Sequence, residues 1–400
     1  MQCRRMSPIV MATCLLITGM SLSAQETLPV GKTEADQRRN AALLKGYDYS
    51  QYPAGITGYT GQDRQQIFFE RRAPAIRTRV GSRGNYKAGV AQVAEGKLFL
   101  ATCRNNNDPE PTKKRFLIHV FESVDQGQSW QEINKTPLYG KEPSLTALPD
   151  GTLVMSAQKG YFGPGSKTKE AINLARSSDG GQTWERYDLP GADYPRNMIV
   201  EPDGSLLFVR AVNSDWSGAG RGSPNLQLCR SADGKTWEFA EGAVDWNEHA
   251  FGEVSAIRLR DGRLLAALRR QIPNTTGEGF EDTVITESSD DGKHWSTPAV
   301  MVNTAEVHVH LTELDDGRIL ATYSNYHLPY GAYAIVSTDG GKTWDRDHPI
   351  RLAASADLYV GWPVTLQLED QSLLTAYALT AYLKQPPETT ATEVVRWRLP

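Results

Sequence analysis

Apolar and polar positions recur along this chain in six similar units. In each unit an apolar segment runs into a tight turn, most often Asp-Gly, and a second apolar segment follows. The turns lie 55, 53, 58, 55 and 54 residues apart, a spacing that suits one four-stranded β unit each. The turn positions are Gly96, Gly151, Gly204, Gly262, Gly317 and Gln371.

A second motif, a variant of Ser-x-Asp-x-Gly-x-Thr-Trp, repeats in phase with these turns. Its Asp can accept a hydrogen bond from the backbone two residues on, its Gly can take positive φ, and its Trp can pack beneath the turn. Repeats of about 40 to 50 residues indicate a propeller. The sequence therefore predicts an all-β, six-bladed β-propeller with Asp-box turns. The five copies begin at Ser123, Ser177, Ser231, Ser288 and Ser337.

The sixth unit ends too soon to supply a full blade. Propellers close their ring by taking a strand from the other terminus, because closure removes exposed sheet edges. The apolar segment at residues 66–79 is the natural donor. We therefore expect an N-terminal strand to complete the last blade.

The N-terminal region predicts a secreted or periplasmic protein. Residues 1–24 have the pattern of a signal peptide: Arg4 and Arg5, an apolar run at 9–20, and small residues up to a cleavage site near Ala24. The run is too short for a stable membrane anchor. Residues 25–63 are polar and predict an extension, and residues 64–400 form the predicted propeller.

Charge and cysteine content narrow the possible partners. A net charge of −4 gives no electrostatic footprint for nucleic acid or an anionic membrane, so we expect a monomer that binds a carbohydrate. No Cys or His cluster has zinc-ligand spacing, and neither a metal nor another cofactor is expected. Cys103 and Cys229 fall in different units and are not expected to form a disulfide.

The inner strand of each propeller blade lines the axis, so a site at its mouth draws residues from every unit. Counting nine residues back from each turn collects charged and aromatic side chains where small or apolar ones would pack. Buried charges cost several kcal/mol unless they are paired, so this register predicts a polar ligand site. Salt bridges between blades are the alternative. The positions are Lys87, Glu142, Pro195 with Arg196 beside it, Glu253, His308 and Trp362.

The ends of the second strands lead to the same mouth. Asp108 follows Arg104 in a loop with three Asn and one Pro. His308 and His310 are expected on one face of a strand, and Trp362, Tyr326 and Tyr330 could stack on a sugar. The residues seven to nine positions beyond the turns are Arg104, Lys159, Arg269, Arg270 and Tyr326.

With these motifs the chain resembles the sialidase superfamily, whose six-bladed propellers carry Asp boxes. The most specific match is GEVSAIRLRDGRLLAALR. The resemblance implies that Glu253 is the general base, that Arg269 is one of three carboxylate-binding arginines, and that Asp108 is the acid/base residue. The Asp boxes themselves are structural in this family.

Three positions depart from the family pattern. Lys87 stands where the first arginine is expected, and a lysine cannot bind a carboxylate through a bidentate fork. His308 and its neighbours stand where the third arginine is expected. Trp362 occupies the place of the nucleophilic tyrosine, for which Tyr359 is a possible substitute three residues upstream.

These residues favour a secreted, exo-acting glycoside hydrolase for a terminal sugar, including an acidic one. An inverting mechanism would use Asp108 as acid and Glu253 or Glu142 as base. The departures argue against true sialidase activity. A carbohydrate-binding propeller without catalysis remains an alternative. So does a lyase, in which His or Tyr removes a proton beside a uronate carboxylate neutralised by Lys87, Arg196 or Arg269.

Overall fold

A computed structural model describes most of the chain from residue 75 onward. The predicted signal peptide and extension lie outside the described residues. The described ranges are 75–82, 84–93, 96–105, 116–135, 137–158, 174–187, 189, 196–212, 225–244, 251–271, 281–302, 305–326, 330–354, 361–380 and 390–399.

The described strands form six separate sheets, which we number as blades 1 to 6 in chain order. Blade 1 holds β2 (Tyr86–Val93), β3 (Lys97–Asn105), β4 (Phe116–Ser123), β5 (Gln131–Glu132) and β6 (Leu138–Tyr139), and blade 2 holds β7 (Lys141–Ala147), β8 (Leu153–Gln158), β9 (Leu174–Ser177) and β10 (Glu185–Tyr187). Blade 3 holds β11 (Ile199–Val200), β12 (Leu206–Val212), β13 (Asn225–Ser231) and β14 (Glu238–Val244), with β18 (His294–Trp295) on its edge.

The remaining three sheets follow the same plan. Blade 4 holds β15 (Phe251–Arg258), β16 (Leu264–Gln271), β17 (Glu281–Ser288) and β19 (Ala299–Val300). Blade 5 holds β20 (Glu306–Glu313), β21 (Ile319–Asn325), β22 (Gly331–Ser337) and β23 (Ile350–Ala354). Blade 6 holds β24 (Gly361–Gln367), β25 (Leu373–Thr380), β26 (Thr390–Trp397) and β1 (Ile76–Val80).

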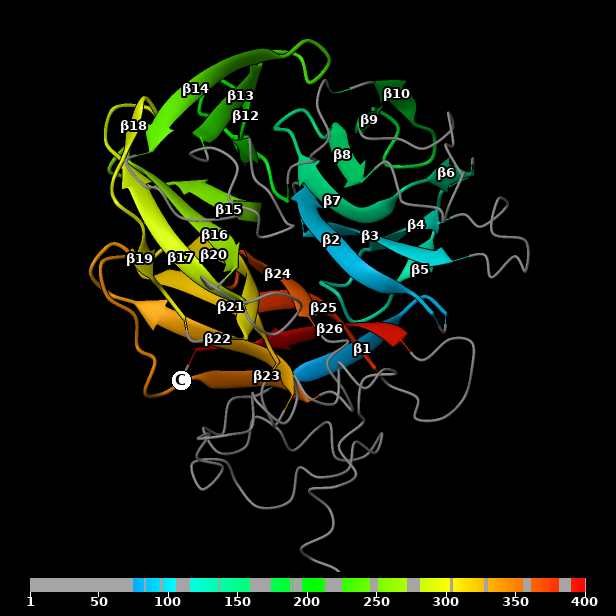
Figure 1. Cartoon of the computed structure of the whole chain (residues 1–400). Helices are drawn as coiled ribbons and strands as arrows, with labels where there is room; N and C mark the ends of the chain where they lie inside the picture. The colour runs from blue at the N-terminus through cyan, green and yellow to red at the C-terminus, as the bar shows by residue number, and fades with distance from the viewer. Residues whose placement is uncertain are drawn as a thin grey trace, which may run out of the picture.

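The six sheets surround one axis, with β2, β7, β15, β20 and β24 nearest to it (Figure 1). Buried apolar residues gather in six clusters, each between two neighbouring blades. Leu207 of blade 3, for example, shares a cluster with Leu264 of blade 4. Since apolar side chains alternate along each strand, both faces of a blade are covered. The fold is therefore the predicted six-bladed β-propeller.

The ring closes through the N-terminal strand, as predicted. β1 pairs antiparallel with β26 from Ile76↔Arg396 to Val80↔Thr392, so the first described strand is the outer strand of the last blade. Val80 also packs in the cluster between blades 6 and 1. Among the described residues, no helix is long and apolar enough to cross a membrane. Cys103 and Cys229 are both free and buried.

The Asp boxes are turns held by side-chain hydrogen bonds. In the first box Asp125 Oδ1 accepts from the backbone N–H of Ser129 at 2.9 Å, and Trp130 Nε1 donates to the carbonyl of Gly127 at 3.1 Å. The Asp therefore bonds the backbone four residues on, whereas the sequence predicted two. In the third box, which is one residue shorter, the backbone N–H of Lys235 donates to Asp233 Oδ1 at 2.8 Å, which is the predicted spacing of two residues.

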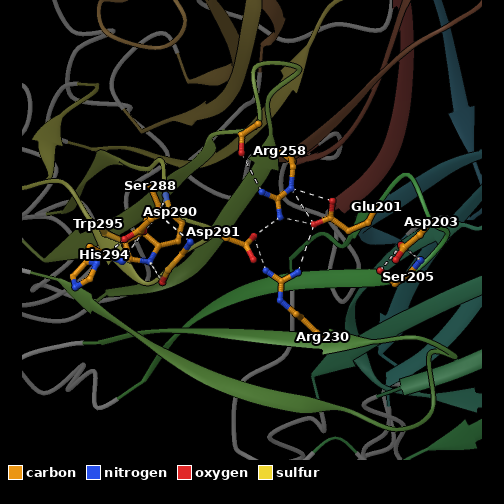
Figure 2. A network of polar contacts seen from close by, with 12 residues as sticks. Glu201, Asp203, Ser205, Arg230, Arg258, Ser288, Asp290, Asp291, His294 and Trp295 are labelled. Carbon is orange, nitrogen blue, oxygen red and sulfur yellow. Dashed lines mark hydrogen bonds and ion pairs between the residues drawn. The ribbon is translucent and has the colours of Figure 1, made fainter.

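Ion pairs fasten neighbouring blades at the end that carries the boxes. Figure 2 shows Arg258 of blade 4 bonded to Glu201 of blade 3 at 2.6 Å and to Asp291 of the fourth box at 2.8 Å. Arg230 of blade 3 reaches the same Asp291 at 2.7 Å. A planar guanidinium bonded to two acids is a geometry in which an ion pair stabilises a fold, unlike an isolated surface pair.

Removal of residues 1–80 should open the ring. The deletion takes away β1 and exposes the edge of β26, so we expect a lower melting temperature and self-association. Thermal unfolding and size-exclusion chromatography measure both effects. Deletion of residues 1–63 keeps β1 and is the control. Equal melting temperatures for the two truncated proteins would show that β1 does not close the ring.

Candidate active site

Five of the six inner strands carry the same irregularity. In each, one residue that is not glycine adopts positive φ, and the strand register shifts around it. Such a β-bulge turns a side chain out of the regular alternation. A left-handed conformation costs such residues about 1 to 3 kcal/mol each. They are Lys87 (φ 53°), Glu142 (φ 56°), Glu253 (φ 52°), His308 (φ 58°) and Trp362 (φ 47°), which we call the axial ring.

The packing around His308 shows how the bulge works. Val307 packs in the cluster between blades 5 and 6, whereas Val309 and Leu311 pack in the cluster between blades 4 and 5. The extra residue therefore reverses which face of β20 the alternate side chains occupy. His308 stands at the point of reversal.

Contacts link the axial ring from blade to blade. Lys87 of blade 1 forms an ion pair with Glu142 of blade 2, and its Nζ lies 3.5 Å from the centre of the Trp362 ring of blade 6. The imidazole of His308 in blade 5 lies 4.1 Å from the same indole, centre to centre. His308 Nε2 lies 3.0 Å from Glu253 Oε2 in blade 4. The five side chains therefore form one connected set around the axis.

The indole of Trp362 is held between its neighbours. Lys87 and His308 contact it from the two adjoining blades. Its Nε1 is buried and finds no hydrogen-bond acceptor among the described residues. Lys87 and His308 therefore occupy space beside the indole that a stacking sugar would need.

Arg269, near the end of β16, contacts the axial-ring residues of blades 4 and 5. Its Nη1 lies 3.3 Å from Glu253 Oε1 and 3.2 Å from His308 Nε2, and its Nη2 donates to Glu281 Oε1 at 2.7 Å. Lys141 Nζ lies 3.2 Å from Glu142 Oε1 on the opposite side. Each carboxylate of the axial ring thus faces cations.

Ser324 fixes two members of the axial ring at once. Its hydroxyl lies 3.2 Å from His308 Nδ1 and accepts the backbone N–H of Trp362 at 3.1 Å. Gly361 makes this approach possible: it has φ 122°, and a Cβ there would lie 1.5 Å from Ser324 Oγ. Tyr326 Oη lies 3.4 Å from the same His308 nitrogen.

Burial and neighbouring charges set the protonation of the Glu253–His308 pair. Burial alone would raise the pKa of Glu253, but His308 and Arg269 hold it well below its usual range. Burial lowers the pKa of His308 to about 3 despite the attraction of Glu253. At neutral pH the carboxylate is therefore ionised and the imidazole neutral. His308 Nε2 faces both Glu253 Oε2, at 3.0 Å, and Arg269 Nη1, at 3.2 Å, while Nδ1 faces the Ser324 hydroxyl at 3.2 Å.

The Lys87–Glu142 pair is ionised as well. Burial lowers the pKa of Lys87 to about 8 against the attraction of Glu142. Burial would raise the pKa of Glu142, but Lys87 and Lys141 lower it to about 2. Glu142 and Glu253 both carry negative charge, so neither is a proton donor at neutral pH.

A cavity of about 420 Å³ lies on the axis and is lined by the inner strands of all six blades. His310 and Arg196 are in its wall. His310 Nδ1 lies 3.4 Å from Thr312 Oγ1 and from the backbone N of Thr365. Burial lowers the pKa of His310 to about 3, and the charge of Arg196 adds to this effect. His310 therefore stands in the cavity wall, with no described contact to the axial ring.

The other predicted residues fall in different places. Arg196 lies near enough to Glu253 and His308 for its charge to act on both. Arg104 Nη1 donates to Ser82 Oγ at 2.6 Å, and no described contact joins Arg104 to the axial ring. Tyr330 is 2% exposed and packs in the core between blades 5 and 6, which leaves no face for a sugar. Asp108, Lys159, Pro195 and Tyr359 lie outside the described residues.

Sequence reasoning missed Ser324, Glu281 and Gly361. A signal for Ser324 was present: it stands seven residues after its turn glycine, as Arg269 does. In both blades that position pairs with the residue just before the left-handed one, Gly252↔Arg269 and Val307↔Ser324. Among the described residues, no three His, Cys, Asp or Glu side chains are grouped to hold a metal ion.

Comparisons with known proteins agree with this architecture. The family model of the BNR/Asp-box repeat matches residues 335–346. A sialidase of Bacteroides fragilis (strain YCH46) is 26% identical over 396 residues, 89% of this chain and 66% of that protein. A sialidase of Paraclostridium sordellii is 23% identical over 286 residues, 63% of this chain and 65% of that protein. The chain is therefore similar in sequence to sialidases. The matches span less than two thirds of either relative's own length.

Solved structures share the fold of this propeller. A Dyadobacter fermentans protein of unknown function has a TM-score of 0.59 at 22% identity, covering 80% of this chain and 96% of that one. The α-L-arabinanase of Penicillium chrysogenum has a TM-score of 0.54 at 15% identity, with 80% and 97% coverage. The NanB sialidase of Streptococcus pneumoniae has a TM-score of 0.55 at 11% identity, with 80% and 70% coverage. At these identities the likeness is one of fold.

Acid should destabilise this propeller partly through His310. Because the folded-state pKa is about 3 and the ordinary value is 6.5, the unfolded chain binds more protons between these values. The free energy of unfolding then decreases as pH falls from 6.5 towards 3, by up to about 1.4 kcal/mol per pH unit for one such group. His310→Asn keeps an acceptor and should make the loss shallower. Urea unfolding between pH 7.5 and 4.5 measures it.

His348→Asn is the matched control, since the His348 side chain is 68% exposed. It should leave the pH dependence of the unfolding free energy as in the parent. An equal slope for His310→Asn and the parent would mean that His310 is not held neutral in the fold.

Proposed function

We propose that this protein is a glycoside hydrolase and that the axial ring, with Arg269 and Arg196, is its active site. The observation that carries the proposal is the convergence of five left-handed residues, one from each of five blades, on one point of the axis. Backbone strain of this kind persists where surrounding structure enforces it and clusters at active sites. Sialidases related in sequence and an arabinanase of the same fold support the reaction class.

Glycoside hydrolysis needs a base or nucleophile, a proton donor and stabilisation of a positively charged transition state. Glu253 fits the first and third roles because it is ionised beside neutral His308 and carries negative charge at the mouth. Glu142 adds a second negative charge and likewise holds no proton. We therefore assign the proton donor to Asp108, which lies outside the described residues.

We infer exo action on a terminal sugar. Lys87 and His308 both contact Trp362 near the propeller axis. A polysaccharide threaded through the ring would have to break these contacts. A chain end entering from the mouth would leave these contacts in place. The signal peptide proposed for residues 1–24 would bring the enzyme to polymeric substrates outside the cytoplasm.

The charges favour a neutral sugar over an acidic one. Lys87 already faces Glu142, and Arg269 faces Glu253 and Glu281. A substrate carboxylate would have to compete with these internal acids for the same cations. Arabinofuranosides and other neutral glycosides are therefore the first substrates to test, with a sialoside beside them.

Glu253→Gln should lower turnover by at least about 10²-fold, since it keeps the side-chain shape and removes the base. The parent is first screened on p-nitrophenyl α-L-arabinofuranoside, neutral pyranosides and an aryl sialoside, and kcat/KM is then measured on the glycoside that is cleaved. Glu287→Gln is the control, because Glu287 lies on the same sheet and pairs with Arg263 instead.

Two results would count against this function. Equal turnover by Glu253→Gln and the parent would remove Glu253 from the chemistry. Oligosaccharide binding by calorimetry without cleavage of any glycoside would indicate a noncatalytic carbohydrate-binding propeller. Cleavage of the sialoside alone would overturn the preference for a neutral sugar and leave the reaction class intact.

A further inference from the structure

One cation beside the propeller axis has no partner among the residues that the structure describes. Lys87 faces Glu142 and Arg269 faces Glu253, each within ion-pair distance. Arg196, which precedes β11 in blade 3, makes no hydrogen bond or ion pair with a described residue. It is half-buried in the wall of the axial cavity. Charges withdrawn from bulk water are usually paired, so a counter-charge for Arg196 is expected within the cavity.

The backbone that carries Arg196 is fixed to the next blade. Asn197 Nδ2 donates to the carbonyl of Ala256 at 2.6 Å, and its Oδ1 accepts the N–H of Ala256 at 3.2 Å. Ala256 belongs to β15, the inner strand of blade 4. Because one amide bonds both backbone groups of this residue, Arg196 is held at the cavity wall before any ligand arrives, and binding does not have to order its backbone.

His310 adds a second hydrogen-bond donor to the same cavity. The backbone N–H of Thr365 donates to His310 Nδ1 at 3.4 Å, so the proton of the neutral imidazole stands on Nε2. Burial holds the pKa of His310 at about 3, which keeps the ring neutral near pH 7. Nε2 makes no hydrogen bond with a described residue. The charge of Arg196 acts on this imidazole, so the two donors lie near each other.

Two donors without an acceptor indicate a ligand that only accepts hydrogen bonds. A guanidinium repels metal cations and an imidazole N–H cannot ligate one, so the ligand is an anion. The cavity of about 420 Å³ is many times the volume of a water molecule, ~30 Å³, and can hold a small ion together with water. None of the five axial-ring residues is among its described lining, so the cavity wall is separate from the ring.

The charges in the wall favour an anion with a single charge. Arg196 supplies one uncompensated positive charge, whereas Arg258, which also lines the cavity, pairs with Glu201. The carboxylate of Glu313 is in the wall as well. A phosphate or sulfate would bring more negative charge than Arg196 can balance and would be repelled by Glu313.

We propose that the axial cavity is a binding site for one small, singly charged inorganic anion, held between Arg196 and His310. Chloride suits these donors, because a spherical ion accepts hydrogen bonds from two different blades without a preferred direction. The bound anion would offset the charge of Arg196, which acts on both Glu253 and His308. The site goes beyond the proposed hydrolysis, because the anion is bound and not converted.

Thermal unfolding tests this site without a substrate. The parent is unfolded in sodium chloride and in sodium gluconate at equal ionic strength, so that the screening of surface charges is the same. We expect the melting temperature to rise with chloride along a saturating curve and to stay flat in gluconate. Arg196→Gln should raise the apparent Kd for chloride at least about tenfold, since it loses a charged donor. Arg318→Gln is the matched control, because Arg318 pairs with Asp316 and is not among the described lining of the cavity.

Crystals of the parent grown in bromide locate the anion directly, and they decide the question even if Arg196→Gln does not fold. We expect an anomalous peak between Arg196 and His310. A bromide peak only elsewhere, or an equal chloride effect in the parent and in Arg196→Gln, would overturn the site. A peak at the site without a chloride effect in solution would mean binding at crystal concentration only, and would also overturn it. Neither measurement needs a glycoside to be cleaved, so this site and the hydrolase function can fail separately.

Discussion

The left-handed residue in five of the six inner strands is the constraint on which the candidate site depends. A regular β-strand sends alternate side chains towards the two neighbouring blades and none along the axis. The bulges at Lys87, Glu142, Glu253, His308 and Trp362 break this alternation once per strand. Without them a packed propeller would have an apolar or empty axis. With them, residues about 50 positions apart in the chain come into contact.

The fold can bury these charges because each carboxylate of the axial ring faces a cation. Lys87 and Glu142 neutralise each other across blades 1 and 2, and Arg269 does the same for Glu253. Removing one partner from a buried pair costs several kcal/mol, because the other is left uncompensated. The ring and the cations beside it are therefore an interdependent unit.

The features of the fold and of the site that could be predicted are those with a signature in the local sequence. The turns at Gly96 and its counterparts need positive φ, so the sequence alone revealed six blades. The axial ring could be located from the same turns, because each of its residues stands nine positions before its turn residue. Arg104 and Arg269 differ in position: Arg104 stands eight residues past its turn and Arg269 seven past, so the two side chains lie on opposite faces of their strands. Gly361 was not predicted, since its contact with Ser324 joins two blades and leaves no local signature. Ser324 was missed although it stands seven residues past its turn glycine, as Arg269 does.

The two ends of the propeller have different roles. Antiparallel pairing places the inner turns and the five Asp boxes at one end of the blades and the axial ring at the other. The box end carries local hydrogen bonds and the bridging pairs of Arg258, and Gln126, Asp291 and Gln371 are left-handed at that end. Five left-handed residues at about 1 to 3 kcal/mol each would consume much of a domain's net stability if nothing offset them. The repeated boxes and inter-blade pairs supply that offset at a distance from the mouth, so the ring can vary in sequence while the scaffold stays the same. This separation explains why the boxes identify the fold so well and the reaction so poorly.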